Sequence, residues 1–185
     1  MKILAVSGSL RRDSWNRKVL ESAAELFPLR TELELYEELK AVPPYDEEDD
    51  VEAAPAAVAH LREAFAGADA VLFATPEYNS SVPGQLKNAI DWVSRPLATN
   101  PLRNKPVAVV GASTGAFGAV WAQAELRKVL AAVGARVVEE GVAFGHAPTR
   151  FDGTGRLIDD DLRDELAEVV DALVTSVRAR ELLAA

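Results

Sequence analysis

The chain has 185 residues, of which 49% are apolar and 26% charged, a balance that suits one globular domain spanning residues 1–185. It contains no cysteine and only two widely separated histidines, so thiol catalysis, disulfides and iron–sulfur clusters are excluded and no metal site is expected. A formal net charge of −9 argues against a nucleic-acid partner, because binding to phosphates requires a basic face.

The beginning of the chain leads directly into a strand-like run and shows no signal-peptide pattern. No apolar stretch approaches the length needed to span a membrane. We therefore expect a cytoplasmic protein with no membrane partner.

Apolar, β-branched runs alternate along the chain with alanine- and leucine-rich segments of helical spacing. Strands are predicted at Ile3–Val6, Glu32–Tyr36, Ala70–Thr75, Pro106–Ala112 and Arg136–Val142. Helices are predicted at Asn16–Leu26, Ala56–Phe65, Gly84–Ser94, Ala119–Val133 and Asp161–Leu183. Because strands that alternate with helices are joined by crossovers, the strands are expected to be parallel.

The patterning of the runs predicts the order of the strands. The first, third and fourth runs are apolar on both faces, as central strands covered by helices should be. The second run alternates apolar and acidic residues, which is typical of an edge strand with one wet face. We predict a three-layer, doubly wound α/β fold with a parallel five-stranded sheet of order 2-1-3-4-5, the flavodoxin-like arrangement, and we count no sixth strand.

An acidic stretch, Tyr45–Pro55, lies between the second strand and the second helix. It lacks the glycine and the ligand spacing of a calcium loop. We interpret it as a solvated loop and assign it no chemistry.

Three unusual loops follow the first, third and fourth strands. They read SGSLRRDSWN from Ser7, TPEYNSSVPG from Thr75 and ASTGAFGAV from Ala112. In an open parallel sheet, ligands bind beyond the carboxyl ends of the strands, where the strand order reverses. In the order 2-1-3-4-5 that position lies between the first and third strands, so the fold is expected to bring the three loops together.

The first loop is interpreted as an anion site. Its hydroxyl, amide and guanidinium groups come from Ser7, Ser9, Arg11, Arg12, Ser14 and Asn16. The start of the following helix points its free N–H groups and its positive dipole end at the same place. The alternative is that Asp13 or Ser14 caps the helix while the arginines face water. The loop lacks the lysine-containing pattern of nucleotide triphosphatases.

The second loop combines two prolines with a polar tip that contains Glu77, Tyr78 and Asn79. A rigid backbone of this kind presents N–H and C=O groups to a heteroaromatic ring, beside which Tyr78 packs. The alternative is an ordinary proline turn with Tyr78 on the surface.

The third loop carries glycines spaced GxxxGxxG from Gly111. One interpretation is a dinucleotide fingerprint, with Glu139 as the ribose contact, although the spacing differs from GxGxxG. We favour a loop in which Gly115 and Gly118 let the backbone approach a ligand held by the other two loops, with Phe117 at the edge of that ligand.

Taken together, the segments GSLRRDSWN, PEYNSSVPGQLKNAIDW and STGAFG resemble the NADPH-dependent FMN reductase family, which includes quinone, chromate and azo-dye reductases of flavodoxin-like fold. The resemblance runs in order along the chain from Ile3 to Val142. It implies FMN as cofactor and NADPH or NADH as co-substrate. The positions that match the cofactor-binding residues of the family are Ser9, Arg11, Ser14 and Asn16 for the phosphate, Pro76, Glu77, Tyr78 and Asn79 for the ring, and Ser113, Gly115, Phe117 and Gly118 for its other side.

The resemblance also implies a ping-pong reaction in which NAD(P)H and then a quinone, azo compound, chromate or free flavin use the bound FMN in turn. Because the hydride chemistry belongs to the flavin, no catalytic side chain is expected.

The resemblance also implies that the protein forms dimers or tetramers, as the family does. The helix with Leu86, Ile90, Trp92 and Val93 is a candidate contact between subunits, although these side chains fit a core equally well. The alternative function is a flavodoxin-type electron carrier, against which Arg11 argues. The acceptor and the preference between NADPH and NADH stay open.

Overall fold

A twisted parallel sheet forms the middle layer of the computed structural model, which describes residues 1–51 and 54–184. Its strands are β1 (Lys2–Ser7), β2 (Glu32–Leu35), β3 (Ala70–Thr75), β4 (Pro106–Ala112), β5 (Arg136–Val137) and β6 (Ala143–Phe144). The order is β2-β1-β3-β4-β5, with β6 also paired to β4, and every pairing is parallel. The predicted order 2-1-3-4-5 is therefore confirmed.

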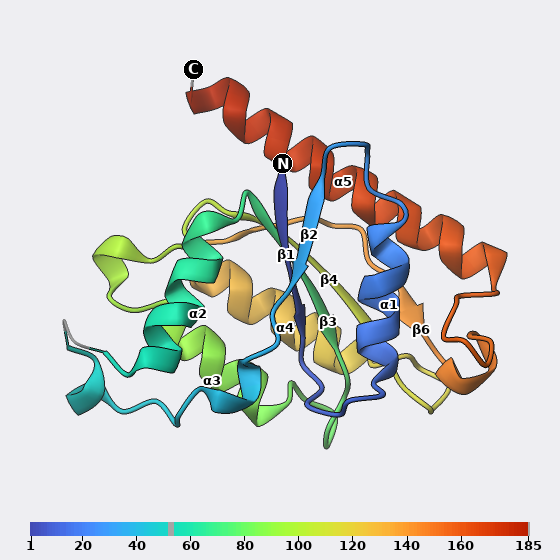
Figure 1. Ribbon diagram of the computed structural model, residues 1–185, viewed down its shortest axis with the longest axis horizontal. Coiled ribbons are helices and arrows are strands. Elements are labelled where there is room, and N and C mark those ends of the chain that lie inside the picture. The colour runs from blue at the N-terminus through green and yellow to red at the C-terminus, as the bar shows by residue number, and fades with distance from the viewer. Residues whose placement is uncertain (52–53, 185) are drawn as a thin grey trace.

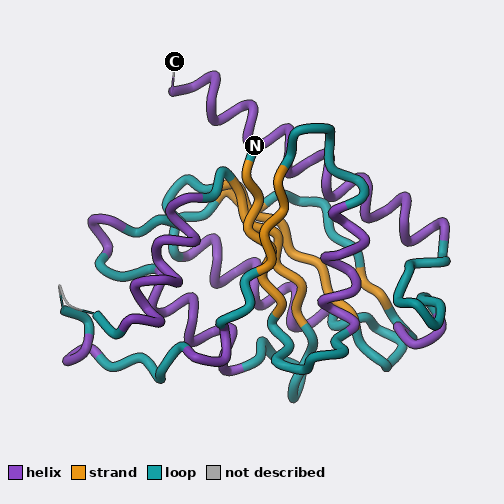
Figure 2. Tube along the Cα trace, in the orientation of Figure 1, coloured by secondary structure: helices purple, strands orange, loops and turns teal. Residues whose placement is uncertain are grey.

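Helices cover both faces of the sheet (Figures 1 and 2). They are α1 (Trp15–Ala24), α2 (Ala56–Gly67), α3 (Gly84–Val93), α4 (Val120–Ala132) and α5 (Asp160–Ala184), with short 3-10 turns η1 (Leu39–Ala41), η2 (Glu47–Asp49), η3 (Leu97–Thr99) and η4 (Ala147–Thr149). The five predicted helices are all present, with ends shifted by one or two residues. Within the described residues, no helix combines the length and the apolar character needed to cross a membrane.

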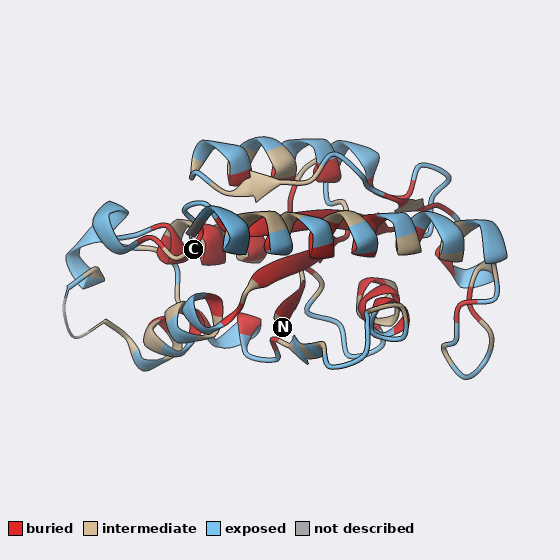
Figure 3. Cartoon of the chain, turned by 90° about the horizontal axis from the view of Figure 1, so that it is seen from above, coloured by how far each residue is buried: buried red, intermediate tan, exposed pale blue. Residues whose placement is uncertain are grey.

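The alternation of side chains along each strand divides the core into two clusters. In β1, Ile3 and Ala5 face α1 and α5, whereas Leu4 and Val6 face α2, α3 and α4. Figure 3 shows the buried residues gathered in the sheet and on the inward sides of the helices. The strands β3 and β4 are buried along their whole length, while β2 alternates exposed and half-buried residues, as predicted for central strands and an edge strand.

The fifth strand differs from its prediction, because the run Arg136–Val142 does not form one continuous strand. The strands β5 and β6 pair with the two ends of β4, and the chain between them leaves the ladder. The Arg127 side chain from α4 occupies the break, where it donates to the carbonyl oxygens of Val138 at 2.6 Å, Val109 at 2.9 Å and Glu140 at 2.6 Å. The guanidinium replaces the missing backbone partners, so the sheet has six strands among the described residues.

The acidic stretch Tyr45–Pro55 contains η2 and continues toward α2, and its residues 52–53 lie outside the described part of the chain. Asp50 accepts from Arg62 on α2 at 2.7 Å. The backbone N–H of Tyr45 donates to the Asn88 side chain on α3 at 2.7 Å. The described part of the stretch is thus tied at two points to the helices beneath it.

Candidate functional site

The loops after β1, β3 and β4 lie together at one end of the sheet (Figure 1). They enclose a cavity of about 140 Å³ at the point where the strand order reverses. The cavity is lined by Ser9, Arg11, Ser14, Trp15, Asn16, Pro76, Glu77, Tyr78, Ala112, Ser113 and Thr114. The three loops therefore meet, as the predicted topology requires.

The N-terminus of α1 opens toward this cavity. Ser14 occupies the N-cap position in an extended conformation, yet its hydroxyl makes no capping hydrogen bond. The first N–H groups of a helix have no partner inside the helix, so those of α1 stay available to an anion together with the Ser14 hydroxyl. In the loop before the helix, the Arg11 N–H donates to the Ser9 hydroxyl at 3.4 Å.

Asn16 joins the first loop to the third. Its side-chain Nδ2 donates to the carbonyl oxygen of Ala112 at 3.0 Å, and its Oδ1 accepts from the Ala112 N–H at 2.9 Å. This buried pair of hydrogen bonds fixes the start of α1 against the end of β4. Asn16 therefore holds two walls of the cavity together, in addition to lining it.

The second loop turns sharply at its tip. Tyr78 and Ser81 exchange two backbone hydrogen bonds of 3.1 Å, and the two residues between them, Asn79 and Ser80, have φ values of 54° and 60°. Positive φ at both central positions is the signature of a type I′ turn. The turn directs Asn79 away from the cavity lining, while Tyr78 remains in it with half of its surface exposed.

Two carboxylates attach this loop to α4. The Glu77 Oε2 accepts from the N–H groups of Trp121 at 3.1 Å and Ala122 at 3.2 Å, so Glu77 caps a helix whose own N-cap residue offers no side-chain bond. In the other direction, the Ser81 hydroxyl donates to Glu125 on α4 at 2.5 Å. This hydrogen bond lowers the pKa of the Glu125 carboxyl.

The third loop is supported from behind by the segment that contains β6. Hydrogen bonds run from the Ser113 N–H to the Phe144 oxygen, from the His146 N–H to the Gly115 oxygen and from the Ala147 N–H to the Ser113 oxygen. His146 thus acts through its backbone, and its side chain is exposed.

Gly118 meets a strict steric requirement at the end of the third loop. Its φ is 55°, and a Cβ at this position would lie 2.5 Å from the carbonyl carbon of Ala143. The backbone of the loop can approach β6 this closely only because residue 118 is glycine.

The structure separates the predicted site residues into two groups. Those that line the cavity are Ser9, Arg11, Ser14, Asn16, Pro76, Glu77, Tyr78 and Ser113. Those outside its lining are Asn79, Gly115, Phe117 and Gly118, which shape or support the loops. Sequence reasoning missed Trp15, Ala112 and Thr114, each of which is adjacent in the chain to a predicted residue.

Exposed aromatic side chains lie beside the cavity. Phe117 is 63% exposed and Trp121 is 50% exposed, and their rings meet edge to face at a centroid distance of 5.0 Å. By contrast, the α3 side chains considered as a subunit contact, namely Leu86, Ile90, Trp92 and Val93, are all buried in the core. The start of α4, in contrast to α3, therefore offers exposed apolar surface to a partner.

The cavity suits the phosphate-bearing end of a flavin nucleotide. At one side of the cavity, hydrogen-bond donors for an anion come from the open N-terminus of α1, from two serine hydroxyls and from Arg11. At the other side, Tyr78 and the proline-containing backbone of the second loop offer a surface for a planar ring. This fold and this site define a class, the doubly wound α/β proteins that hold a phosphate-bearing cofactor at the switch point of the sheet.

Comparison with known proteins identifies the family within this class. The chain belongs to the NADPH-dependent FMN reductase family, whose model matches residues 1–149. Members of this family are FMN-dependent oxidoreductases, and the chain is an oxidoreductase of flavodoxin-like fold.

Individual relatives match nearly the whole chain. An NAD(P)H-dependent FMN reductase from Pseudomonas aeruginosa is 42% identical over 96% of each protein. A 2-hydroxy-1,4-benzoquinone reductase from a Burkholderia species is 36% identical over 98% of this chain and 99% of its own. Among solved structures, the flavoenzyme NAD(P)H:(acceptor) oxidoreductase FerB from Paracoccus denitrificans is similar with a TM-score of 0.86 and 35% identity, covering 96% of this chain and 97% of its own.

Proposed function

We propose that this protein is an FMN-dependent NAD(P)H oxidoreductase that reduces quinones and, more broadly, azo compounds, chromate or free flavin. The observation that carries the proposal is the cavity in which the loops after β1, β3 and β4 meet, with anion donors at one side and an aromatic surface at the other. The relative named as a 2-hydroxy-1,4-benzoquinone reductase favours a quinone as the acceptor.

The residues of the first loop would hold the phosphate of FMN. Arg11 supplies a permanent positive charge, while Ser9, Ser14 and the free N–H groups of α1 supply hydrogen-bond donors. Asn16 contributes mainly by fixing the start of α1 to Ala112. These groups orient the cofactor, so removing one weakens cofactor retention.

The second and third loops would enclose the ring of the cofactor. The backbone of Pro76 and Glu77 and the Tyr78 ring line one side, and the backbone of Ser113 and Thr114 lines the other. Asn79, Gly115, Phe117 and Gly118 act from outside the lining, by shaping the loops that carry these groups.

When bound, FMN supplies the redox chemistry by taking a hydride from NAD(P)H and passing the electrons to the acceptor. The protein contributes binding and orientation, and its backbone N–H groups stabilise negative charge on the ring. Because NAD(P)H and the acceptor would exchange electrons with the same bound FMN, they react in turn, which predicts ping-pong kinetics.

The test is to add FMN to the purified protein and then NADPH with a benzoquinone. We expect FMN to bind, seen as quenching of its fluorescence, and NADPH to be consumed without a partner reductase. Arg11→Ala should weaken FMN binding by about tenfold, since it removes a charge-assisted hydrogen bond, whereas Arg178→Ala on the exposed side of α5 should not. Failure to bind FMN would refute the proposal, and binding without NADPH oxidation would indicate an electron carrier instead.

The proposal includes assembly into a homodimer or homotetramer. Its support is the exposed pair Phe117 and Trp121, next to Val120, at the start of α4. Light scattering should give at least twice the monomer mass, and Trp121→Ser should shift the equilibrium toward monomer. The matched control is Leu182→Ser, which removes an exposed apolar side chain at the end of α5. A monomeric parent protein would contradict this part of the proposal.

We further propose that residues 1–185 form one domain and that the protein resides in the cytoplasm. The first part is supported by α5, whose buried Leu166, Leu173 and Val177 pack on the same core cluster as β1 and α1. The second part is supported by the proposed use of NAD(P)H, and cell fractionation tests it.

A further inference from the structure

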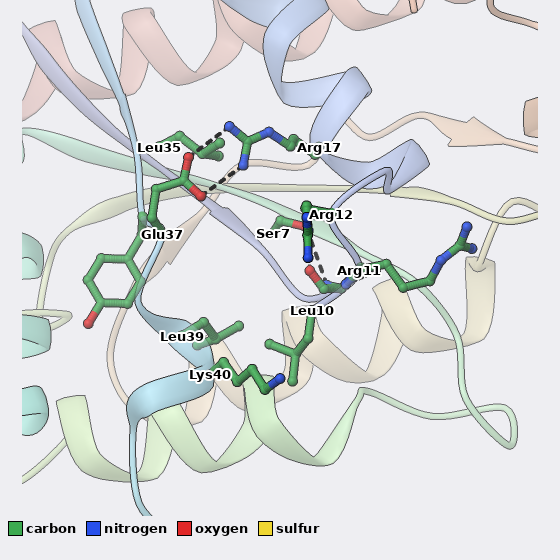
Figure 4. Close-up of a pocket in the computed structure, with 11 residues that line it drawn as sticks. Ser7, Leu10, Arg11, Arg12, Arg17, Leu35, Glu37, Leu39 and Lys40 are labelled. Carbon is green, nitrogen blue, oxygen red and sulfur yellow. Dashed lines mark hydrogen bonds and ion pairs between the residues drawn. The ribbon is translucent and has the colours of Figure 1, made fainter.

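A second cavity lies on the other side of the first loop. Its volume is about 210 Å³, and it is bounded by the end of β1 and the first loop on one side and by the end of β2 and η1 on the other (Figure 4). Ser9 and Arg11 line both this cavity and the one between the three loops. A ligand that crosses the first loop can therefore occupy both.

The lining of this second cavity is basic in a protein whose net charge is −9. The cationic residues are Arg11, Arg12, Arg17 and Lys40, against a single carboxylate, Glu37, within the lining. The Arg17 guanidinium binds Glu37 through two hydrogen bonds of 2.8 and 2.7 Å, and this contact lowers the pKa of the Glu37 carboxyl. Arg17 also binds Glu21 at 2.9 Å, so its one positive charge is shared by two carboxylates, of which Glu37 lines the cavity.

Three positive charges remain without a carboxylate partner. Among residues 1–51 and 54–184, the side chains of Arg11, Arg12 and Lys40 make no hydrogen bond or ion pair with another residue. In the view of Figure 4, Glu37 and Arg17 lie on one side, Lys40 and Leu10 on the opposite side, and Arg12 between them, while Arg11 extends away from this group. Arg12 and Lys40 are therefore the free cations that belong to this cavity alone.

The position of Glu37 bears on the choice between nicotinamide nucleotides. In the Rossmann fold, a carboxylate about 20 residues after the phosphate-binding glycines binds the ribose 2′-hydroxyl of NAD, whereas a nearby arginine accommodates the 2′-phosphate of NADP. This sheet has the flavodoxin-like order, so only the chemistry of these contacts carries over. Glu37 follows β2 by two residues, but its carboxylate is held by Arg17, whereas Arg12 and Lys40 in the same lining have no carboxylate partner among the described residues. The cavity is also smaller than the roughly 300–1,000 Å³ of a complete ligand pocket, which suits an end group.

We propose that this cavity binds the 2′-phosphate of NADPH through Arg12 and Lys40 and makes the protein prefer NADPH to NADH. The proposal rests on the proposed use of NAD(P)H. The dinucleotide crosses the first loop, so that its nicotinamide end reaches the flavin cavity while its 2′-phosphate lies between the first loop and η1.

The first test uses ligand binding and does not depend on turnover. Calorimetric titration in phosphate-free buffer compares 2′,5′-ADP, which carries the 2′-phosphate, with 5′-ADP, which has two phosphates but no 2′-phosphate. We expect 2′,5′-ADP to bind more tightly and the double variant Arg12→Ala, Lys40→Ala to lose at least about tenfold of that affinity. An equal loss for both nucleotides, no loss for either, or tighter binding of inorganic phosphate than of 2′,5′-ADP would overturn the proposal.

The second test uses the FMN-loaded protein with a quinone in excess. In the double variant, kcat/KM for NADPH should fall by about tenfold or more, while kcat/KM for NADH stays within about twofold. The matched control is Arg178→Ala with Lys128→Ala, which removes the same charges from exposed helical positions away from the cavity. A parallel fall for both nucleotides would refute the assignment of the 2′-phosphate.

The two tests separate the failure of this inference from the failure of the proposed function. Absence of turnover with both nucleotides in the parent protein refutes the proposed function, yet the titration with 2′,5′-ADP still measures the cavity. Turnover in the parent protein with no preference for NADPH refutes this inference alone.

Discussion

Glu77 does more for the architecture of the site than its position in a cofactor motif indicates. Its carboxylate receives the N–H groups of Trp121 and Ala122, and so replaces the missing N-cap side chain at Ala119. Ala119 has no side-chain oxygen and cannot serve this purpose itself. The Glu77 side chain consequently couples the second loop to the start of α4, beside the Ser81–Glu125 hydrogen bond one turn further along the helix.

The variant Glu77→Ala should lower the free energy of unfolding of the FMN-free protein by about 1 kcal/mol, the usual cost of losing an N-cap. Glu77→Gln keeps an acceptor oxygen and should lose less than half of this amount. Urea denaturation measures both, with Glu63→Ala on the exposed side of α2 as control. Identical stability of Glu77→Ala and the parent protein would show that the helix does not depend on this cap.

Lys105 is a buried ammonium group at the start of β4. Its Nζ donates to the carbonyl oxygen of Phe65 at 2.6 Å and to that of Ala68, at the C-terminal end of α2. Burial lowers the pKa of Lys105 from 10.5 to about 8. The side chain therefore joins a helix end to the sheet at the cost of desolvating a charge.

This pKa shift predicts a pH dependence with a definite sign. Between pH 8 and 10.5 the unfolded chain still holds the Lys105 proton while the native protein has lost it, so the free energy of unfolding rises with pH in this window. The rise is at most about 1.4 kcal/mol per pH unit. Lys105→Met should be less stable overall and should lack this slope when both proteins are denatured in urea at several pH values. Parallel slopes for the two proteins would contradict the shift.

At the scale of elements, the break between β5 and β6 shapes the third loop. A continuous fifth strand would pair along the whole of β4. Here the Arg127 guanidinium instead donates hydrogen bonds where backbone hydrogen bonds between the two strands are missing. The chain then returns to β4 as β6, and the residues after it support the third loop through hydrogen bonds to Ser113 and Gly115. The geometry of one cavity wall thus depends on an arginine outside that wall.

Replacing Arg127 with methionine should lower the free energy of unfolding by about 3 kcal/mol, because it leaves half-buried carbonyl oxygens without donors. Hydrogen exchange should accelerate first at Val138 and then in β6, since the segment 138–140 that leads to β6 loses its link to α4. The neighbouring Lys128→Met, whose side chain is exposed on the same helix, is the control. Unchanged exchange in β6 would show that the break does not depend on the guanidinium.

At the scale of the whole molecule, one sheet carries both core clusters, and the last helix completes one of them. The C-terminal end of α5 projects past the sheet (Figure 1), but its buried residues between Leu166 and Val177 belong to the core cluster that includes residues of β1 and β4. A cofactor that binds where three strands end therefore stabilises all the layers together.

We expect thermal and urea unfolding to be single transitions, with far-ultraviolet circular dichroism and tryptophan fluorescence coinciding. FMN at 100 times its dissociation constant should add about 2.7 kcal/mol to the free energy of unfolding. A separate early transition attributable to α5 would contradict the single-domain proposal. An unchanged midpoint with FMN would contradict the proposed cofactor.

Most of the fold was predictable because its signals are local or simply periodic. The fully apolar runs of β3 and β4, the acidic alternation of β2 and the helical spacing of α2 are each readable in a window of a few residues. The polar loops after three strands were equally visible, and the topology rule brought them to one place. The break in the fifth strand was not predictable, because it depends on Arg127 from another element.

The amino-acid sequence by itself determined the class of fold, the strand order and the three loops that meet, since these follow from patterning and from the connectivity of parallel strands. Only the tertiary structure decided which groups are still free to bind a ligand. Asn16 and Glu77 are engaged by backbone groups of other elements, and Glu37 is bound by Arg17. Arg12 and Lys40 remain unpaired among the described residues. The physical reason is that whether a polar side chain is free or occupied depends on partners distant in sequence, which come within hydrogen-bond distance only in the folded chain.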